Sequence, residues 1–298
     1  MPAAIETDRL TKSYGRARGI DELSLSVARG EVFGFLGPNG AGKTTMIRTL
    51  LDLLHPTSGS ARIFGLDSRR DSRAIRARVG NLPGEFSYED RVTGGELLRF
   101  FAELRGMDGL GGVQSLAERF GADLSRPLRA LSRGNRQKIG LIQALFHEPE
   151  LLIFDEPTAG LDPLMQEEFL TVVAEHRDRG VTVFLSSHDL DEVERICDRV
   201  SIIREGRLAA IETVEDMRGR AYRNVTARFG RPVAIADFEA LPGAQDIELD
   251  GTTVRFRILG DLDAAIKAIA RHPVADVEVT RPTLEELFLT YYDRGGGA

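Results

Sequence analysis

The sequence predicts an α/β protein with a mostly parallel sheet, followed by a small α+β domain. In the first two thirds of the 298 residues, short β-branched or apolar runs alternate with helical stretches, as in chains that build parallel sheets. Past about residue 220 the pattern changes to short strands with two helical stretches between them. The length leaves room for one large domain or two unequal ones. We expect a main domain over residues 1–220 and an accessory domain over residues 221–298.

Four apolar segments of the main domain are predicted strands: Val32–Leu36, Leu151–Phe154, Val181–Leu185 and Val200–Arg204. The last two are continuous apolar runs rather than alternating ones. Strands that are covered on both faces have this pattern, so these segments should lie inside a parallel sheet.

Three helices of the main domain have clear start signals. Thr93 with Glu96 three residues on forms a capping box, and Asp162 before Pro163 gives an N-cap with proline at the first helical position. A third helix, Gly134–Phe146, places apolar residues on one face and stops before a proline. The first and second of these helices should run to about residues 105 and 179.

The accessory domain has the predicted order strand, helix, strand, strand, helix, strand, which is the split βαβ pattern of small ferredoxin-like domains. Its strands are Tyr222–Phe229, Ala244–Leu249, Thr253–Leu259 and Val274–Thr280, and its helices lie near 235–240 and 261–272. Thr283–Phe288 is predicted as a capped amphipathic helix, and Gly295–Gly297 as a frayed end.

The composition is that of a soluble globular protein, with 42% hydrophobic residues and a net charge of −7. The lone Cys197 cannot form an internal disulfide and no signal-peptide pattern follows Met1, so we expect a cytoplasmic protein. The longest charge-free run, Val32–Gly42, is shorter than the roughly 20 apolar residues of a membrane-spanning helix. The acidic balance argues against a broad basic surface, so we expect no nucleic-acid partner.

Some conspicuous residues have plain structural interpretations. Cys197 lies on an apolar helix face and is interpreted as a buried small hydrophobe. The arginine cluster is interpreted as a solvated helix face, because an aspartate interrupts it and no aromatic residues accompany it. Its members are Arg69, Arg70, Arg73, Arg76 and Arg78. Four histidines are interpreted as surface or packing residues: His55, His147, His176 and His272.

A phosphate-binding loop follows the first predicted strand and opens a helix. The eight residues that match G-x-x-x-x-G-K-[ST] are Gly37, Pro38, Asn39, Gly40, Ala41, Gly42, Lys43 and Thr44. The glycines let the backbone approach phosphate oxygens, and the helix N-terminus presents unpaired N–H groups to them. Lys43 supplies a charge for the β and γ phosphates, and Thr44 a hydroxyl for Mg²⁺. The adjoining Thr45 belongs to the same expected nucleotide site.

Two adjacent carboxylates end the predicted strand Leu151–Phe154. Ligands of open α/β sheets gather at the carboxyl ends of strands, so Asp155 and Glu156 should face the same phosphates. Asp155 is the expected Mg²⁺ ligand, through water. Glu156 is the expected general base that polarises the attacking water.

From about Leu10 to Gly206, the order of motifs resembles the ATP-binding cassette (ABC) superfamily of P-loop ATPases. The resemblance implies a mostly parallel sheet with a helical subdomain at about 85–148. It also implies roles for residues of four further segments. Tyr14 would stack on adenine, Ser132 and Gly134 would cap the γ-phosphate of an opposite subunit, Asp162 would lie in the loop at the dimer interface, and His188 would contact the γ-phosphate.

The sequence departs from the family pattern in two places. Arg133 and Asn135 replace Gly and Gln of the signature L-S-G-G-Q, and the charge of Arg133 either clashes with a partner's phosphate or attracts it. Gly84 stands where the family usually has a Gln that reaches Mg²⁺ and the lytic water, and Glu85 is the candidate replacement. The intact Lys43 and Glu156 nevertheless predict ATP hydrolysis.

The resemblance implies the ATPase subunit of a membrane exporter, which closes head to tail with a second cassette, expected to be a second copy of this chain. A separate transmembrane permease would hold it at the inner face of the cell membrane and select the substrate. Gly80–Pro83 and the tail Thr283–Leu289 resemble the drug-export branch of daunorubicin-resistance-type subunits. Two alternatives remain at this stage: an ABC-type ATPase that acts on DNA or ribosomes, and a degenerate regulatory half of a heterodimer.

Overall fold

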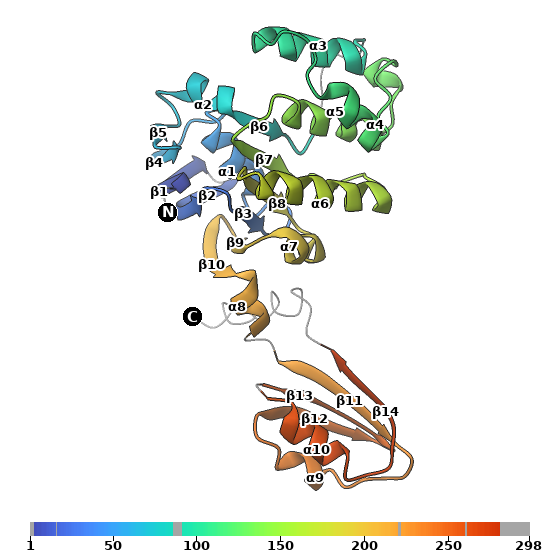
Figure 1. Ribbon diagram of the computed structural model, residues 1–298. Coiled ribbons are helices and arrows are strands. Elements are labelled where there is room, and N and C mark those ends of the chain that lie inside the picture. Colours follow the sequence, from blue (N-terminus) through green and yellow to red (C-terminus); the bar gives the residue numbers. More distant parts are fainter. Residues whose placement is uncertain (1–2, 16, 86–90, 220–221, 260, 281–298) are drawn as a thin grey trace. The chain divides into compact units, whose positions relative to one another are not determined.

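A computed structural model describes residues 3–15, 17–85, 91–219, 222–259 and 261–280, with the side chains of 17, 18, 218 and 219 left aside. Contacts divide the chain between Glu212 and Thr213 into two compact units, each described by itself (Figure 1). The boundary therefore falls eight residues before the expected one at 220/221. The expected helix at Thr283–Phe288 and the expected frayed end at Gly295–Gly297 lie outside the described residues.

A six-stranded sheet with the order β10-β9-β3-β8-β7-β6 forms the centre of the first unit. Its strands are β3 (Val32–Leu36), β6 (Val79–Leu82), β7 (Leu151–Asp155), β8 (Thr182–Ser187), β9 (Arg199–Arg204) and β10 (Arg207–Thr213). Neighbours from β9 to β6 run parallel. The four strands predicted from sequence all lie within two residues of their expected bounds, because a run that is buried on both faces is apolar throughout.

A second, antiparallel sheet was not predicted. It has the order β2-β1-β4-β5, built from β1 (Ala3–Tyr14), β2 (Ala17–Ala28), β4 (Ser58–Ile63) and β5 (Leu66–Asp67). One face of it packs into the same core as β3, through apolar residues at every second position such as Leu23, Leu25 and Val27. This period of two is the signal in the sequence that could have revealed it.

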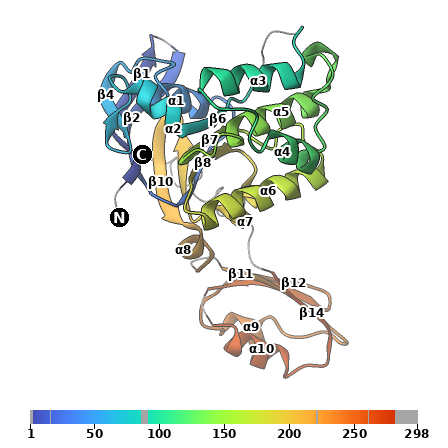
Figure 2. The same cartoon turned by 45° about the horizontal axis from the view of Figure 1, so that its top comes forward.

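Helices contact the strands of the central sheet, and three further helices lie between β6 and β7 in the chain. The helices α1 (Lys43–Leu50), α6 (Pro163–Asp178) and α7 (Leu190–Ile196) contact its strands, and α2 (Ser72–Arg78) leads directly into β6. Between β6 and β7 the chain forms α3 (Gly94–Leu104), α4 (Val113–Phe120) and α5 (Arg133–Leu145), which group together in Figures 1 and 2. The three predicted helices end within one residue of expectation, with the capping box at Thr93 in place.

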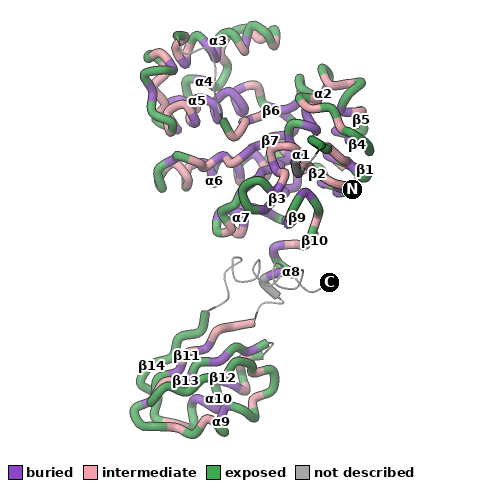
Figure 3. The backbone as a smooth tube through the Cα atoms, turned by 180° about the vertical axis from the view of Figure 1, so that it is seen from behind, coloured by how far each residue is buried: buried purple, intermediate pink, exposed green. Residues whose placement is uncertain are grey.

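The core of the first unit lies along β3, β7 and β8, which are buried throughout. Figure 3 shows buried backbone, in purple, around β3 and β7. The rings of Phe33 and Phe184 stack across neighbouring strands with centroids 5.9 Å apart. This rigid centre holds the carboxyl ends of the strands in fixed register, and the candidate site is built on those ends. Among the described residues, no helix has the length and apolarity that crossing a membrane demands.

The second unit begins with α8 (Val214–Gly219) and continues as a four-stranded antiparallel sheet of order β12-β13-β11-β14. Its elements are β11 (Arg223–Phe229), α9 (Ala236–Glu239), β12 (Ala244–Asp250), β13 (Thr253–Ile258), α10 (Asp263–Ile269) and β14 (Val274–Thr280). The order from β11 to β14 (strand, helix, strand, strand, helix, strand) is the order that the sequence predicts, but the two helices are shorter than expected. Phe229, Phe238 and Phe256 lie in its own apolar core.

Candidate nucleotide-binding site

The phosphate loop connects β3 to α1, as the motif requires. Gly42 has a φ of +112°, and a Cβ there would lie 2.9 Å from the carbonyl oxygen of Gly19. At Gly37 a Cβ would lie 2.6 Å from the carbonyl oxygen of Ile203. The two glycines are therefore needed because the loop is pressed between β2 and β9, and this packing fixes its path around the site.

Lys43 is the first residue of α1, and its side chain is only 6% exposed. Its Nζ donates to the carbonyl oxygens of Gly37 at 2.5 Å and Pro38 at 3.3 Å. The same Nζ forms an ion pair with Glu156 Oε1 at 3.0 Å. The loop thus holds its lysine against the acid at the end of β7, and the charge of the ammonium group remains where phosphates would bind.

Asp155 ends β7 and is 2% exposed. Thr44 Oγ1 donates to its Oδ2 at 2.7 Å, and Ser186 Oγ donates to its Oδ1 at 2.6 Å. The register of the sheet explains the second contact, because Asp155 on β7 is paired with Ser186 on β8. Both carboxylate oxygens are therefore oriented by hydroxyl groups.

The donor chemistry of Thr44 and Asp155 fits Mg²⁺. A carboxylate and a hydroxyl are hard oxygen ligands, and Mg²⁺ is usually held by one or two such groups together with substrate phosphates and water. In the part of the chain that the structure describes, no group of three or more His, Cys, Asp or Glu could hold a metal ion. A phosphate-bound cation at Thr44 and Asp155 would therefore find one hydroxyl and one carboxylate of the protein.

Glu156 and His188 meet above this pair. The Nδ1 of His188 lies 2.5 Å from Glu156 Oε2, and the His188 side chain is 60% exposed. Glu156 has a φ of +51°, an unusual conformation for a residue with a side chain, and its N–H donates to the carbonyl oxygen of Ser186 at 3.1 Å. Such backbone conformations are concentrated at functional sites. Glu156 therefore lies between a lysine and a histidine, with Oε1 at ion-pair distance from Lys43 and Oε2 at hydrogen-bond distance from His188.

Tyr14 lies next to Gly19, which in turn contacts the phosphate loop. A Cβ on Gly19 would lie 3.3 Å from the ring of Tyr14, and Gly19 in turn borders Gly42 of the phosphate loop. The ring is 44% exposed, and Lys12 Nζ lies 5.4 Å from its centroid. An exposed aromatic ring beside the loop is consistent with the expected contact to a base.

Three predicted site residues form a second group through contacts of their own. Ser132 is the N-cap of α5 and accepts from Asn135 N at 3.2 Å, and Asp162 is the N-cap of α6 and accepts from Met165 N at 3.1 Å. Gly134 connects the two segments, because a Cβ on it would lie 2.6 Å from the carbonyl oxygen of Gly160. We call Ser132, Gly134, Gly160 and Asp162 the signature group.

Gln137 links the signature group to the acids, and sequence reasoning missed it. It lies on α5, is 4% exposed, and its Nε2 donates to the carbonyl oxygens of Pro157 at 2.9 Å and Glu156 at 3.4 Å. Sequence reasoning also missed Gly19, and it gave Ser186 no role of its own. A signal exists for two of these residues: Gln137 is a polar residue on the buried face of a helix, and Ser186 stands two residues before the motif histidine His188.

The two departures from the family pattern have defined places. A Cβ on Gly84 would lie 3.2 Å from Asp155 Oδ2, so this position borders the candidate metal site and leaves it bare of a side chain. Glu85, the candidate replacement, is exposed. Arg133 lies against the segment that contains Gly160, since a Cβ on Gly160 would approach its Cγ and Cδ at 3.4 Å. Asn135 contributes its backbone N–H to the Ser132 cap.

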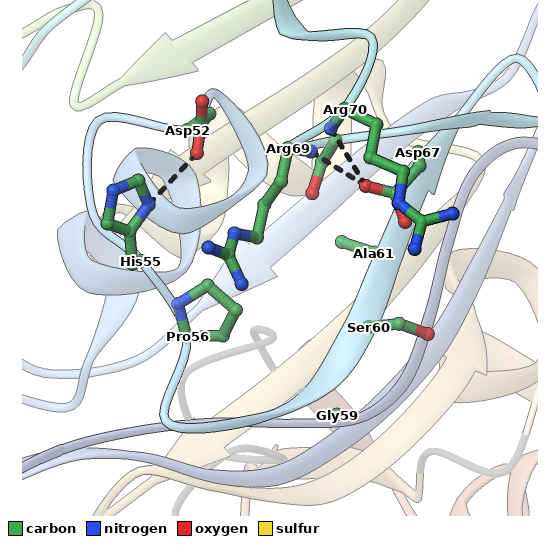
Figure 4. Close-up of a pocket in the computed structure, with 10 residues that line it drawn as sticks. Asp52, His55, Pro56, Gly59, Ser60, Ala61, Asp67, Arg69 and Arg70 are labelled. Atoms are coloured by element: carbon green, nitrogen blue, oxygen red, sulfur yellow. Dashed lines mark hydrogen bonds and ion pairs between the residues drawn. The ribbon is translucent and has the colours of Figure 1, made fainter.

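The other arginines and histidines have mainly structural contacts, as expected. Arg78 forms a bidentate pair with Glu150. Figure 4 shows a pocket beside Arg69 and Arg70 with a volume of about 440 Å³, and no phosphate-loop residue lines it. Asp67 there accepts from the N–H groups of both arginines at 3.0 Å, and Asp52 lies 3.1 Å from His55. The two carboxylates of this pocket are thus already engaged.

Cys197 is buried, as expected, and burial raises the pKa of its thiol well above the ordinary value. His176 is also buried, and its Nδ1 lies 2.7 Å from the carbonyl oxygen of Val172. Burial lowers the pKa of His176, so this side chain favours the neutral form.

Comparison with known proteins agrees with this geometry. Residues 20–159 match the family model described as ABC transporter. The chain is 34% identical over 260 residues to the bacitracin transport ATP-binding protein BcrA of Enterococcus faecalis, which covers 86% of this chain and 84% of that protein. It is 34% identical over 300 residues to the daunorubicin resistance ATP-binding protein DrrA3 of Streptomyces coeruleorubidus, covering 96% and 95%.

A solved structure gives the same result. The ATP-binding subunit of an ABC transporter is 30% identical, covers 72% of this chain and 92% of its own, and superimposes with a TM-score of 0.65. The predicted resemblance is confirmed. This chain belongs to the ABC transporter family as an ATP-binding subunit with the P-loop fold of its ATPases.

Proposed function

We propose that this chain hydrolyses ATP to power a membrane exporter, with Glu156 as the general base and Lys43 and His188 as its electrostatic partners. The observation that carries the proposal is the chain of contacts from Lys43 through Glu156 to His188. It gathers the phosphate loop, the end of β7 and the end of β8 at one point. A base there can orient a water molecule while two neighbouring groups face the charge that develops on the phosphate.

Mg²⁺ would be held by Thr44 and Asp155, where it would neutralise charge on the phosphates. Ser186 donates to Asp155 Oδ1, the oxygen that Thr44 does not contact, and this hydrogen bond restrains the rotation of the carboxylate. The phosphate loop supplies backbone N–H groups, and Lys43 supplies the charge for the β and γ phosphates. Tyr14 supplies a ring for adenine. Lys43 and Thr44 open α1 after β3, Asp155 and Ser186 lie on β7 and β8 of the central sheet, and Tyr14 ends β1 of the antiparallel sheet.

The signature group points to a second chain. Ser132 and Asp162 cap α5 and α6, and among the described residues no printed hydrogen bond or ion pair joins either of them to Lys43. In a head-to-tail dimer, the signature group of one copy would face the phosphate loop of the other. ATP would then join the two copies and hydrolysis would release them, which gives a two-state mechanical element.

A separate permease would complete the exporter. Phe100 and Leu104 on α3 expose 57% and 70% of their surface, and such apolar side chains one turn apart suit a partner helix. Two relatives bear the names bacitracin transport and daunorubicin resistance. We infer that the cargo is a drug-like molecule that the permease selects, and that the ATPase works at the inner face of the cell membrane.

One rival retains a specific observation in its favour. Gly84 leaves the candidate metal site without a side chain at one corner, and a cassette with a weakened site would suit the regulatory half of a heterodimer. The other rival, an ATPase that acts on DNA or ribosomes, is not favoured by the relatives, which are transport subunits.

The replacement Glu156→Gln tests the proposal. It keeps the shape of the side chain and removes the base, so ATP should bind without turnover and hold two copies together. Size-exclusion chromatography with ATP should show a dimer, with the exposed Glu103→Gln as the matched control and Lys43→Ala as the variant that lacks the phosphate contact. A wild-type protein with no turnover above Lys43→Ala would favour the regulatory rival, and a monomeric Glu156→Gln protein would contradict the homodimer.

A further inference from the structure

Glu192 is a buried acid on α7 that lies between two segments of the site. Glu192 is only 6% exposed. Its Oε2 accepts hydrogen bonds from two hydroxyl groups. Ser187 Oγ donates at 2.8 Å and Thr158 Oγ1 at 3.2 Å. Ser187 directly precedes His188, and Thr158 follows Glu156 by two positions. One carboxyl group thus ties the segment of the histidine to the segment of the base.

The second oxygen of Glu192 distinguishes this contact from ordinary packing. Oε1 is buried, and among the described residues it has no hydrogen-bond partner. A buried carboxylate with one bare oxygen is costly, and an uncharged residue of similar shape would avoid that cost. A charged group at this position therefore calls for a reason other than stability.

The pKa of the Glu192 carboxyl group lies near neutral pH. Burial, above all, raises the pKa of this carboxyl group to about 7, and the hydrogen bonds from Ser187 and Thr158 act in the opposite direction. The ionisable groups that face it are Asp189 at the start of its own helix, Glu156 after β7 and the buried thiol of Cys197. All three of these groups are acidic, so none of them can neutralise the negative charge of Glu192.

We propose that Glu192 is a positioning residue that couples the His188 segment to the Glu156 segment, and that its ionised form holds both segments in the geometry for ATP hydrolysis. A hydrogen bond to a carboxylate is stronger than one to a neutral acid, so ionisation tightens the hold on both hydroxyl groups. The inference rests on the proposed catalytic roles of Glu156 and His188, because Glu192 touches neither of them through a hydrogen bond and acts through their neighbours.

The test measures ATP turnover and ATP affinity separately as a function of pH. In Glu192→Gln, kcat at pH 8 should fall by about fivefold or more, because small displacements of catalytic groups are costly, while the Kd for ATP stays within about twofold. Turnover of the wild-type protein should rise with pH through about 7, and this rise should be absent in Glu192→Gln. Asp191→Asn, an exposed acid on the same helix, is the matched control and should behave as wild type.

A double-mutant cycle separates positioning from simple loss of structure. Thr158→Val removes one of the two hydroxyl donors, so Glu192→Gln combined with Thr158→Val should lower kcat by less than the product of the two single effects. Fully multiplicative effects, or a Glu192→Gln protein with the wild-type pH profile, would overturn the inference. If Glu192→Gln does not fold, Thr158→Val alone must flatten the rise near pH 7 for the inference to stand.

Glu156→Gln, measured in parallel, separates this inference from the proposed function. Wild-type turnover in Glu156→Gln would refute the proposed base itself. Loss of turnover in Glu156→Gln together with an unchanged Glu192→Gln would refute only the role of Glu192.

Discussion

At the scale of single residues, Ser186 shows how a buried hydroxyl orients the carboxylate of the candidate metal site. It is fully buried, and its Oγ donates to Asp155 Oδ1 at 2.6 Å. In Ser186→Ala this oxygen loses its donor inside the protein, which should destabilise the fold by about 1–3 kcal/mol and weaken the Mg²⁺ dependence of turnover. Urea denaturation and Mg²⁺ titrations of ATPase activity measure the two effects.

The matched control is Ser201→Ala on β9. Ser201 is equally buried, and its Oγ donates to the carbonyl oxygen of Gly34 at 3.5 Å rather than to a carboxylate. Its replacement should leave the Mg²⁺ titration unchanged. Equal effects of the two variants on that titration would show that Ser186 has no special relation to Asp155.

Glu192 also makes the stability of the fold depend on pH. Its pKa is raised from 4.5 to about 7 by burial, so the folded protein binds a proton that the unfolded chain releases. The contribution of this group to stability is fully present below about pH 4.5 and is lost as pH rises through about 7. The loss is on the order of 3 kcal/mol, because each pKa unit corresponds to about 1.4 kcal/mol.

Glu192→Gln cannot ionise and should escape this loss. The difference in the free energy of unfolding between Glu192→Gln and wild type should therefore shift in favour of the variant between pH 5 and pH 8. Urea denaturation at the two pH values measures it. A difference that does not change with pH would contradict the raised pKa of Glu192.

At the scale of elements, α5 connects the signature group to the segment of the proposed base, Glu156. Gln137 supplies this connection, since its amide donates to the backbone of Pro157 and Glu156. In Gln137→Leu these carbonyl groups lose that donor, which should destabilise the fold by about 1–3 kcal/mol and lower kcat. Unfolding curves and steady-state kinetics measure both.

Gln114→Leu on α4 is the control for this helix contact. Gln114 forms only a local, exposed hydrogen bond to Glu118 at 2.8 Å, which is worth at most about 0.5 kcal/mol. If Gln137→Leu were no more harmful than Gln114→Leu, α5 would be attached to the acids by packing alone.

The elements also show which features a sequence reveals. Strands β7 and β8 were predicted because burial on both faces makes them apolar throughout, and α3 and α6 because their caps are explicit. The antiparallel sheet was missed, although β2 alternates, because the predicted class was a parallel one. The motifs placed Lys43 and Glu156 in the site, but their 3.0 Å contact depends on the strand order, which no local pattern contains.

At the scale of the whole molecule, the separation of the predicted site into two groups decides how many chains make one site. Lys43, Thr44, Asp155, Glu156 and His188 are gathered by hydrogen bonds and ion pairs, whereas Ser132 and Asp162 cap other helices. The family resemblance already implied that Ser132 acts on the nucleotide of an opposite subunit, but no local sequence pattern showed this separation. The geometry of the single chain favours two.

Mixing two inactive variants tests this assignment. Lys43→Ala removes the phosphate contact, and Ser132→Asp places a negative charge in the signature group while keeping a good N-cap for α5. Each variant alone should be nearly inactive. In a head-to-tail heterodimer, however, one site combines the intact Lys43 of one copy with the intact Ser132 of the other.

The mixture should therefore recover activity that neither variant has. If copies exchange at random, half of the dimers are mixed and each holds one intact site of two, so about a quarter of wild-type turnover is expected. Lys43→Ala mixed with Glu156→Gln is the control. Lys43 and Glu156 belong to the same group, so each copy in this mixture lacks one of the two residues and no site is intact. Recovery in that control, or none in the test mixture, would show that the signature group does not act across the dimer.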